Sequence, residues 1–353
     1  MGKHRDLTLN LLLLFALGAF LWWAEGNLDG YKIQVLNLIA INAILAVSLN
    51  LIYGFTGMFS LGHAGFMAVG AYTCALLILP PIQKEMIYIL EPLIWPFSAL
   101  HAPFFVAVLA GGIMAGVFSL FIAMPVLRLG GDYLGIASLG FAEIIRVVFT
   151  NATPITNGAL GIKGIPDYAN LWWNWGWCVL TLYVIVRLLK SNFGNCLKPI
   201  RDDEVAARAM GIDTFRYRVI SFVVGAFFAG VGGALMGSLI TTIDPKMFTF
   251  LLTFNVLMIV VAGGLGSITG SVLGSVVITV LLEWLRFVEN PIDLGSLHIP
   301  GIPGMRMVIF SLALLLIILF RREGIMGQRE WTWSGLGRLL SRGRGSADGG
   351  DAR

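Results

Sequence analysis

The chain has 353 residues, of which 57% are hydrophobic and 12% are charged, and its mean hydropathy is +0.84. This composition excludes a soluble globular protein and indicates a polytopic membrane protein. The isoelectric point near 9.0 does not indicate nucleic-acid binding, because the basic residues lie between apolar runs. Cys74, Cys178 and Cys196 share no pair spacing, so we interpret them as small apolar residues.

Ten apolar runs approach the roughly 20 residues that a membrane-spanning helix needs. The first run follows a basic start like that of a secretory signal, but it lacks a cleavage site, and we expect a retained span. Two runs, 63–80 and 248–264, are short and glycine-rich and suit broken or re-entrant segments. We therefore predict an all-α fold with about eight to ten transmembrane helices. The ten runs are 7–24, 31–53, 63–80, 103–127, 132–150, 171–190, 216–241, 248–264, 268–288 and 304–320.

The positions of the basic residues predict the orientation of these spans. Seventeen of the 24 Lys and Arg residues fall on the side of both termini, four fall on the opposite side, and three lie within or at the edges of spans. Because positive residues concentrate on the cytoplasmic side, both termini are expected to be cytoplasmic. We expect a transmembrane domain over residues 1–327, with a cytoplasmic loop at 191–215, and a basic, disordered tail at 328–353 near anionic membrane lipid.

Residues 198–211 are the only long, charge-rich, helix-forming stretch between apolar runs. Pro199 suits the start of a helix, acidic residues follow it, and Gly211 suits the position after the helix end. A helix of about two to three turns is too short to be stable alone in water. We therefore predict one short helix that lies on the membrane surface and is offered to a partner.

Glycine clusters and isolated polar residues mark candidate positions in the spans. Small residues allow close helix packing or a bent backbone beside a substrate path, and plain packing is the alternative. A lone histidine without Cys or carboxylate neighbours does not predict a metal site, and we expect His63 to be a hydrogen-bonded structural residue unless it relays protons. The glycine candidates are Gly57, Gly62, Gly65, Gly263, Gly264 and Gly266. The candidates for the substrate pathway are Asn42, Asn50, Ser60, His63 and Asn255.

Two charged pairs share an i,i+3 spacing inside spans, Glu143 with Arg146 and Glu283 with Arg286. This spacing places both partners on one helix face, where they can neutralise each other. An unpaired charge at mid-membrane costs about 2.5–3.5 kcal/mol on insertion scales, so a partner is expected. The pairs can line a polar pathway or lie near the outer interface.

The sequence contains no GxxxxGK[ST] phosphate loop, HExxH, CxxC or GxSxG motif. We therefore expect neither an ATP site nor catalytic residues in this chain, and predict that it is not an enzyme. If it pumps a substrate, the energy comes from another protein.

Several motifs, in order over about residues 35–327, resemble a known family. They are SLGHAGFMAVGAY, GDYLGIASLGFAEIIRVV, ITNGALGI, DDEVAARAMGID, AGGLGSITGSVLG and MRMVIFSLALLLIILFRREGI. Together they resemble the permease subunits of bacterial ABC importers for branched-chain amino acids, the LivM type. The resemblance implies a multi-pass protein of the bacterial inner membrane.

The resemblance also implies partners: a second, homologous permease, two cytoplasmic ATPase subunits that bind ATP and Mg²⁺, and a periplasmic binding protein that docks on the outer loops. It implies that the charged helix couples the permease to the ATPase. A urea or short-amide importer is the alternative substrate class, and a stand-alone channel or secondary transporter is the alternative of another class. The implied coupling residues are Arg201, Asp202, Asp203, Glu204, Ala206, Ala207, Arg208 and Gly211.

Overall fold

The computed structural model describes residues 2–88, 91–128, 133–289, 292–294, 297–299, 304–320, 324–327 and 330. Each predicted apolar run contains a helix. The helices of the first half are α1 (Gly2–Asn27), α2 (Gly30–Asn50), a π-helical turn (Leu51–Phe55), α3 (His63–Ile78), α4 (Pro81–Ile87), α5 (Phe104–Val126), α6 (Tyr133–Asn151) and α7 (Thr153–Thr156). Those of the second half are α8 (Leu171–Leu189), α9 (Asn192–Asp202), α10 (Glu204–Ala209), α11 (Thr214–Ile240), α12 (Phe250–Gly263), α13 (Ile268–Leu285) and α14 (Met305–Phe320).

Five helical segments of the described chain are long and apolar enough to cross a membrane. They are Gly30–Phe55, α5, α6, α11 and α13. Two bent pairs, α3 with α4 at 119° and α8 with α9 at 75°, bring the number to seven if each pair is one span. Residues Leu11–Asn27 of α1 and helix α12 are apolar but shorter. The all-α polytopic class is confirmed, and the larger count of eight to ten spans stays a prediction.

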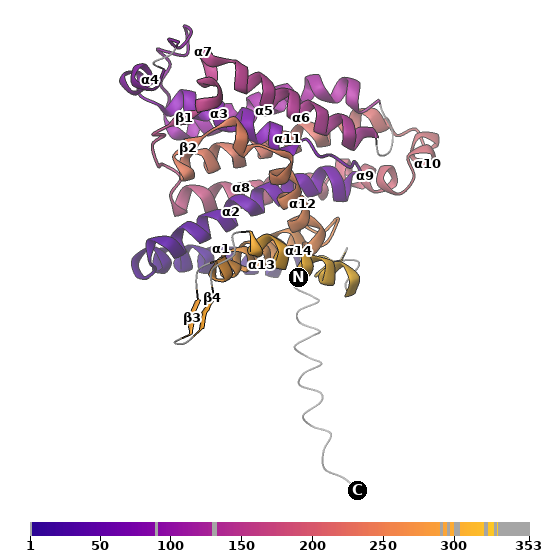
Figure 1. Cartoon of the computed structure of the whole chain (residues 1–353). Helices are drawn as coiled ribbons and strands as arrows, with labels where there is room; N and C mark the ends of the chain where they lie inside the picture. The colour runs from indigo at the N-terminus through magenta and orange to yellow at the C-terminus, as the bar shows by residue number, and fades with distance from the viewer. Residues whose placement is uncertain are drawn as a thin grey trace.

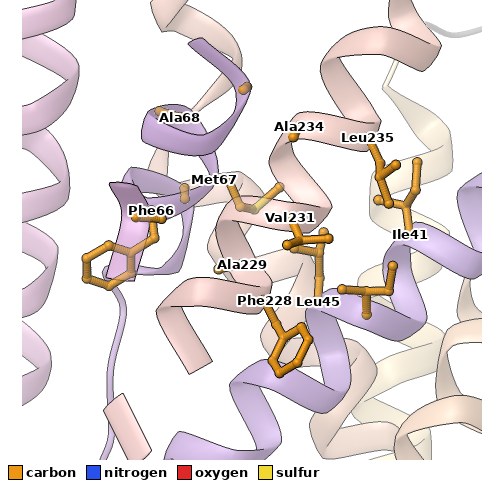
Figure 2. Close-up of a cluster of buried hydrophobic side chains, with 14 of the residues drawn as sticks. Ile41, Leu45, Phe66, Met67, Ala68, Phe228, Ala229, Val231, Ala234 and Leu235 are labelled. Atoms are coloured by element: carbon orange, nitrogen blue, oxygen red, sulfur yellow. The ribbon is translucent and has the colours of Figure 1, made fainter. Parts of the chain in front are cut away.

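Helix α11 forms the centre of the bundle and packs against α2, α3 and α5. Figure 2 shows apolar side chains of α2, α3 and α11 meeting there, among them Leu45, Met67 and Val231. Glycines allow the close approach of these helices: a Cβ on Gly70 would lie 2.1 Å from the carbonyl oxygen of Gly230. The small residues of the sequence therefore provide close helix packing, as predicted.

The two ends of the bundle carry different structures (Figure 1). Helices α9 and α10 lie at one end, here called the α10 end. The other end carries α4 and two short strands, β1 (Ile162–Lys163) and β2 (Thr242–Ile243), which pair antiparallel. A second antiparallel pair joins β3 (Ile292–Leu294) to β4 (Leu297–Ile299). These four short strands are the only ones in the described ranges, so they do not alter the helical class.

Candidate functional site

The prediction of a single helix over residues 198–211 is wrong, because the chain breaks at Asp203 into α9 and α10. The Asp203 carboxylate accepts hydrogen bonds from the backbone N–H groups of Val205 (2.8 Å) and Ala206 (3.0 Å), which makes it the N-cap of α10. Pro199 lies inside α9 rather than at a helix start. An aspartate three positions before Ala206, the first alanine of this Ala-rich helix, is the sequence signal for the second helix start.

The end of α10 follows the prediction for Gly211. Its φ of +83° lies in the left-handed region that glycine adopts readily. The N–H of Gly211 donates to the carbonyl of Arg208 (2.9 Å), and the N–H of Ile212 donates to that of Ala207 (3.1 Å). This pair of bonds is a Schellman motif, which ends α10 sharply. Helix α10 is thus capped at both ends despite having only six residues.

Glu204 attaches α10 to the start of α11. Its carboxylate pairs with the guanidinium of Arg218 at 2.6 Å and with that of Arg208, and it accepts a hydrogen bond from the hydroxyl of Thr214 at 3.2 Å. Burial acts to raise the pKa of Glu204, but the charges of Arg218 and Arg208 and their hydrogen bonds outweigh burial and lower it. Glu204 is therefore a half-buried anchor that holds α10 to α11 rather than part of an exposed contact surface.

Of the other side chains of α10, some are buried and some are exposed. Ala207 is fully buried, whereas Val205 and Met210 are 77% and 66% exposed. Exposed apolar residues on a short helix outside the membrane suit a protein contact. Val205 and Met210 were not among the predicted coupling residues, although their apolar character within a charged stretch of sequence distinguishes them. We call the exposed set Val205, Ala206, Ala209 and Met210 the α10 patch.

Arg201, in the last turn of α9, lies against two loops of the bundle. Its guanidinium Nη1 is 3.4 Å from the carbonyl oxygen of Gly54, and its Nε pairs with Asp202 at 3.0 Å. Gly57 and Gly266 have φ values of +74° and +79°, and a Cβ on either would lie 3.1 Å from the Arg201 side chain. The glycines thus provide the space in which Arg201 contacts both loops.

Asn50, at the end of α2, joins the same loops from inside the bundle. It is fully buried, and its amide nitrogen donates to the carbonyl of Ser267 (2.9 Å) and the hydroxyl of Ser271 (2.7 Å). Its amide oxygen accepts the N–H of Gly266 at 2.9 Å. Asn50 therefore ties α2 to the turn between α12 and α13. We call Asn50, Gly54, Gly57, Arg201 and Gly266 the junction.

The chain after α14 returns to the same turn. The N–H groups of Ile325 and Met326 donate to the last carbonyls of α12, those of Ala262 (2.8 Å) and Gly263 (3.1 Å). The Glu330 carboxylate accepts the N–H of Ile268 (2.6 Å) and the N–H and hydroxyl of Thr269 (3.3 and 3.0 Å), and so covers the start of α13. Apart from Glu330, the predicted tail 328–353 lies outside the described residues.

The predicted pathway residues make separate contacts with different partners. His63 is buried, and its Nε2 lies 3.0 Å from the hydroxyl of Ser48, which also donates to the carbonyl of Leu45 (2.8 Å). This arrangement joins α3 to α2 and is consistent with a structural role for His63.

The other pathway candidates are spread along the helices. Asn42 donates to the hydroxyl of Thr279 at 2.8 Å and joins α2 to α13. Ser60 is buried and lies 3.4 Å from the N–H of Gly62. Asn255 is half-buried in α12 and has no hydrogen-bond partner among the described residues. A role in the substrate path stays a prediction for these residues.

The other glycine candidates allow close contacts between segments. A Cβ on Gly62 would lie 2.8 Å from the carbonyl oxygen of Ser138 in α6, and one on Gly263 would lie 2.2 Å from that of Gly270 in α13. Gly65 faces α6, and Gly264 faces residue 327.

The two charged pairs differ in geometry although their spacing is the same. Arg146 donates from Nε to Glu143 at 2.6 Å, a closed ion pair. Arg286 Nη1 lies 3.9 Å from Glu283, beyond hydrogen-bond distance. The predicted neutralisation thus holds for the first pair and is incomplete for the second.

Comparison with known proteins relates this architecture to transport systems. The family described as "Branched-chain amino acid transport system / permease component" matches residues 31–319. The LivM permease protein of the Escherichia coli high-affinity branched-chain amino acid transport system is 32% identical over 297 residues, which cover 74% of this chain and 64% of that protein. A probable LivM protein of Methanocaldococcus jannaschii is 26% identical, over 81% of this chain and 90% of its own.

A second permease protein of the Escherichia coli system, LivH, is 22% identical over 64% of this chain and 75% of its own. This chain spans 64% of the length of the Escherichia coli LivM protein. No solved structure matches the chain. Because the family covers residues 31–319, from the start of α2 to the end of α14, the chain belongs to the branched-chain amino acid transport system permease family.

Proposed function

We propose that this chain is the membrane-spanning permease subunit of an ATP-driven importer for leucine, isoleucine and valine in the bacterial inner membrane. In this proposal, separate ATPase subunits bind ATP and Mg²⁺, a homologous permease completes the path, and a periplasmic binding protein delivers the substrate. The relatives named LivM and LivH support a pair of permeases. This chain itself binds no cofactor and catalyses no reaction.

The observation that carries the proposal is α10, a six-residue helix anchored on one face and exposed on the other. Glu204 and Ala207 hold it against the permease, and the α10 patch presents apolar side chains outward. Since so short a helix is not stable alone, its capped and anchored form is a preorganised contact surface. An ATPase subunit with a complementary apolar groove is the partner that this surface suits.

The junction connects α10 and α9 to the membrane-spanning helices, so a displacement of α10 can be transmitted to them. Closure of the ATPase pair would displace α10, and α9 would move with it because one residue separates them. Arg201 would then act on the loop after α2 and on the turn between α12 and α13, which Asn50 already ties together. Movement at the surface would thus reach α2 and α13, two spans of the bundle.

Substitutions that introduce negative charge into the α10 patch test the proposal. Val205→Asp with Met210→Asp places two carboxylates at exposed positions, so the permease should fold normally. Co-purification of the ATPase subunits and uptake of radiolabelled leucine in cells should both be lost, because burying an unpaired charge in an apolar contact is costly. Leu160→Asp, at an exposed apolar position close to β1 near the opposite end, is the control and should retain the ATPase subunits. Full leucine uptake by the double variant would refute the coupling role of α10.

Competition defines the substrate in the same cells. Unlabelled isoleucine and valine should block leucine uptake, and urea should not. If deletion of the chain lowered urea uptake and left leucine uptake unchanged, the substrate would be a short amide instead. If no ATPase subunit co-purified with the unmodified chain, the chain would instead be a stand-alone channel or secondary transporter.

A further inference from the structure

A groove of about 940 Å³ lies between α1, α2 and α13, away from the junction. Its floor and walls are mainly apolar and include Ile39 and Leu36 of α2 and Val280 of α13. Its mouth carries charged and aromatic residues. These are Tyr31, Lys32, Glu283, Trp284 and Arg286.

The charged residues meet at one level of the bundle. Lys32 lies at the start of α2 and Arg286 directly after the end of α13, and these antiparallel helices pack side by side. Tyr31 and Ile39 both line the groove and are eight residues apart on α2, so the groove extends about 12 Å along the helix at 1.5 Å per residue. The groove is therefore polar at its mouth and apolar along the span.

The charges at the mouth balance once Asp29, the partner of Lys32, is counted, and they are only partly satisfied. Lys32 pairs with Asp29 at 3.2 Å, while Glu283 and Arg286 are separated by 3.9 Å. The Glu283 side chain is only 20% exposed and has no hydrogen-bond donor among the described residues. Glu143 and Arg146, with the same spacing elsewhere, close to 2.6 Å. The open pair therefore leaves a carboxylate and a guanidinium available to a ligand that carries both charges.

We propose that this groove binds one zwitterionic phospholipid, such as phosphatidylethanolamine. Arg286 and Lys32 hold its phosphate, Glu283 holds its ammonium, and the acyl chains lie along Leu36, Ile39 and Val280. Trp284 and Tyr31 lie at the level of the headgroup, as aromatic residues do at membrane interfaces. The groove itself is lined by two basic groups, Lys32 and Arg286, and one acidic group, Glu283, and the Asp29 carboxylate that pairs with Lys32 brings the mouth to two of each. This balance favours a zwitterion over an anionic lipid.

The size and position of the groove favour a lipid over other ligands. A free amino acid would fill only a small part of it, whereas a lipid uses both the charged mouth and the apolar wall. The groove lies on helices that bear exposed apolar side chains, among them Phe20 and Val280. The inference does not depend on the proposed coupling of α10 to an ATPase.

Native mass spectrometry of the full chain in detergent tests the inference. The delipidated protein is titrated with phosphatidylethanolamine or phosphatidylglycerol, and bound lipid is counted. Phosphatidylethanolamine should bind more tightly than phosphatidylglycerol, and Lys32→Ala with Arg286→Ala should weaken its binding about tenfold or more, because two charge-assisted contacts are lost. Glu283→Gln should reverse the preference toward phosphatidylglycerol, because it removes the partner of the ammonium. Glu143→Gln, in the closed pair, is the matched control and should leave both affinities unchanged.

Two results would overturn the inference. One is phosphatidylethanolamine binding that the Lys32 and Arg286 substitutions do not weaken. The other is loss of the bound lipid when the second permease subunit is present, which would show that protein covers the groove. The reversal of lipid preference in Glu283→Gln is the result that a merely structural role of the charges would not produce.

Discussion

Replacing Asn50 by alanine is expected to destabilise the permease much more than replacing Asn42, although both residues lie on α2. Asn50 is fully buried and makes three hydrogen bonds to the turn between α12 and α13 and to the start of α13. Asn42 is half-buried and makes one, to Thr279. The comparison separates a structural clamp from an ordinary contact between helices.

The hydrogen bonds that each substitution removes determine the expected loss in free energy of unfolding. Without Asn50, the carbonyl of Ser267 still accepts the hydroxyl of Ser271 (3.1 Å), but the N–H of Gly266 loses its acceptor. A lost hydrogen bond costs about 1 kcal/mol, and a buried group left unpaired costs about 1–3 kcal/mol. Asn50→Ala should therefore cost about 3–5 kcal/mol, against about 1 kcal/mol for Asn42→Ala.

Reversible unfolding in mixed micelles of detergent and SDS measures the two free energies of unfolding on the same scale. The difference between the two variants should be about 2 kcal/mol or more. Equal free energies of unfolding for Asn50→Ala and Asn42→Ala would refute the structural role of Asn50. A normal stability for Asn50→Ala, combined with an altered profile of competing substrates, would instead place Asn50 in the substrate path.

Three further predictions concern neighbouring contacts. Gly54→Ala would place a Cβ 2.4 Å from the backbone nitrogen of Gly266 and should lower the free energy of unfolding by about 2 kcal/mol or more, whereas Gly176→Ala, in open space on α8, should not lower it. Because the pKa of Glu204 is lowered, its attachment of α10 should be complete above the ordinary glutamate pKa of about 4.3 and be lost only as the pH falls through the lowered value. Proteolysis of α10 measured from pH 7 to pH 3 should show this loss, and Glu204→Gln should remove the pH dependence. Glu330→Ala should speed amide hydrogen exchange at Ile268 by exposing the start of α13, and an unchanged rate would contradict the contact.

The sequence predicted the helices well because a span is encoded locally, by an apolar run of sufficient length. The end of α10 was also predictable, since Gly211 specifies a left-handed residue by itself. The division between α9 and α10 was not predicted, because Pro199 suggested a helix start and its position inside α9 depends on the preceding turn at Ser191. Local signals compete at such positions, and packing decides between them.

The site itself depended on contacts that no local pattern encodes. Asn50 and Ser267 are 217 residues apart, and Arg201 and Gly54 are 147 residues apart. Asn50 is a polar residue in an apolar run, which fits a substrate ligand and a structural clamp equally well until its partners are known. The pairing of Glu204 with Arg218 was hidden for the same reason, because α10 and α11 had to be placed against each other first.

The junction combines strong and weak contacts, and their distribution indicates where movement should occur. Asn50 holds α2 to the turn between α12 and α13 through three buried hydrogen bonds of 2.7–2.9 Å, so these parts should move together. Arg201 contacts Gly54 through a single bond of 3.4 Å, and it meets glycines that present no side chain. Displacing α9 over this surface breaks little, whereas separating α2 from α13 breaks the clamp. A partner that moves α10 would therefore shift α9 across the junction first, and would move α2 and α13 as one unit only when Arg201 reaches the limit of the space between Gly57 and Gly266.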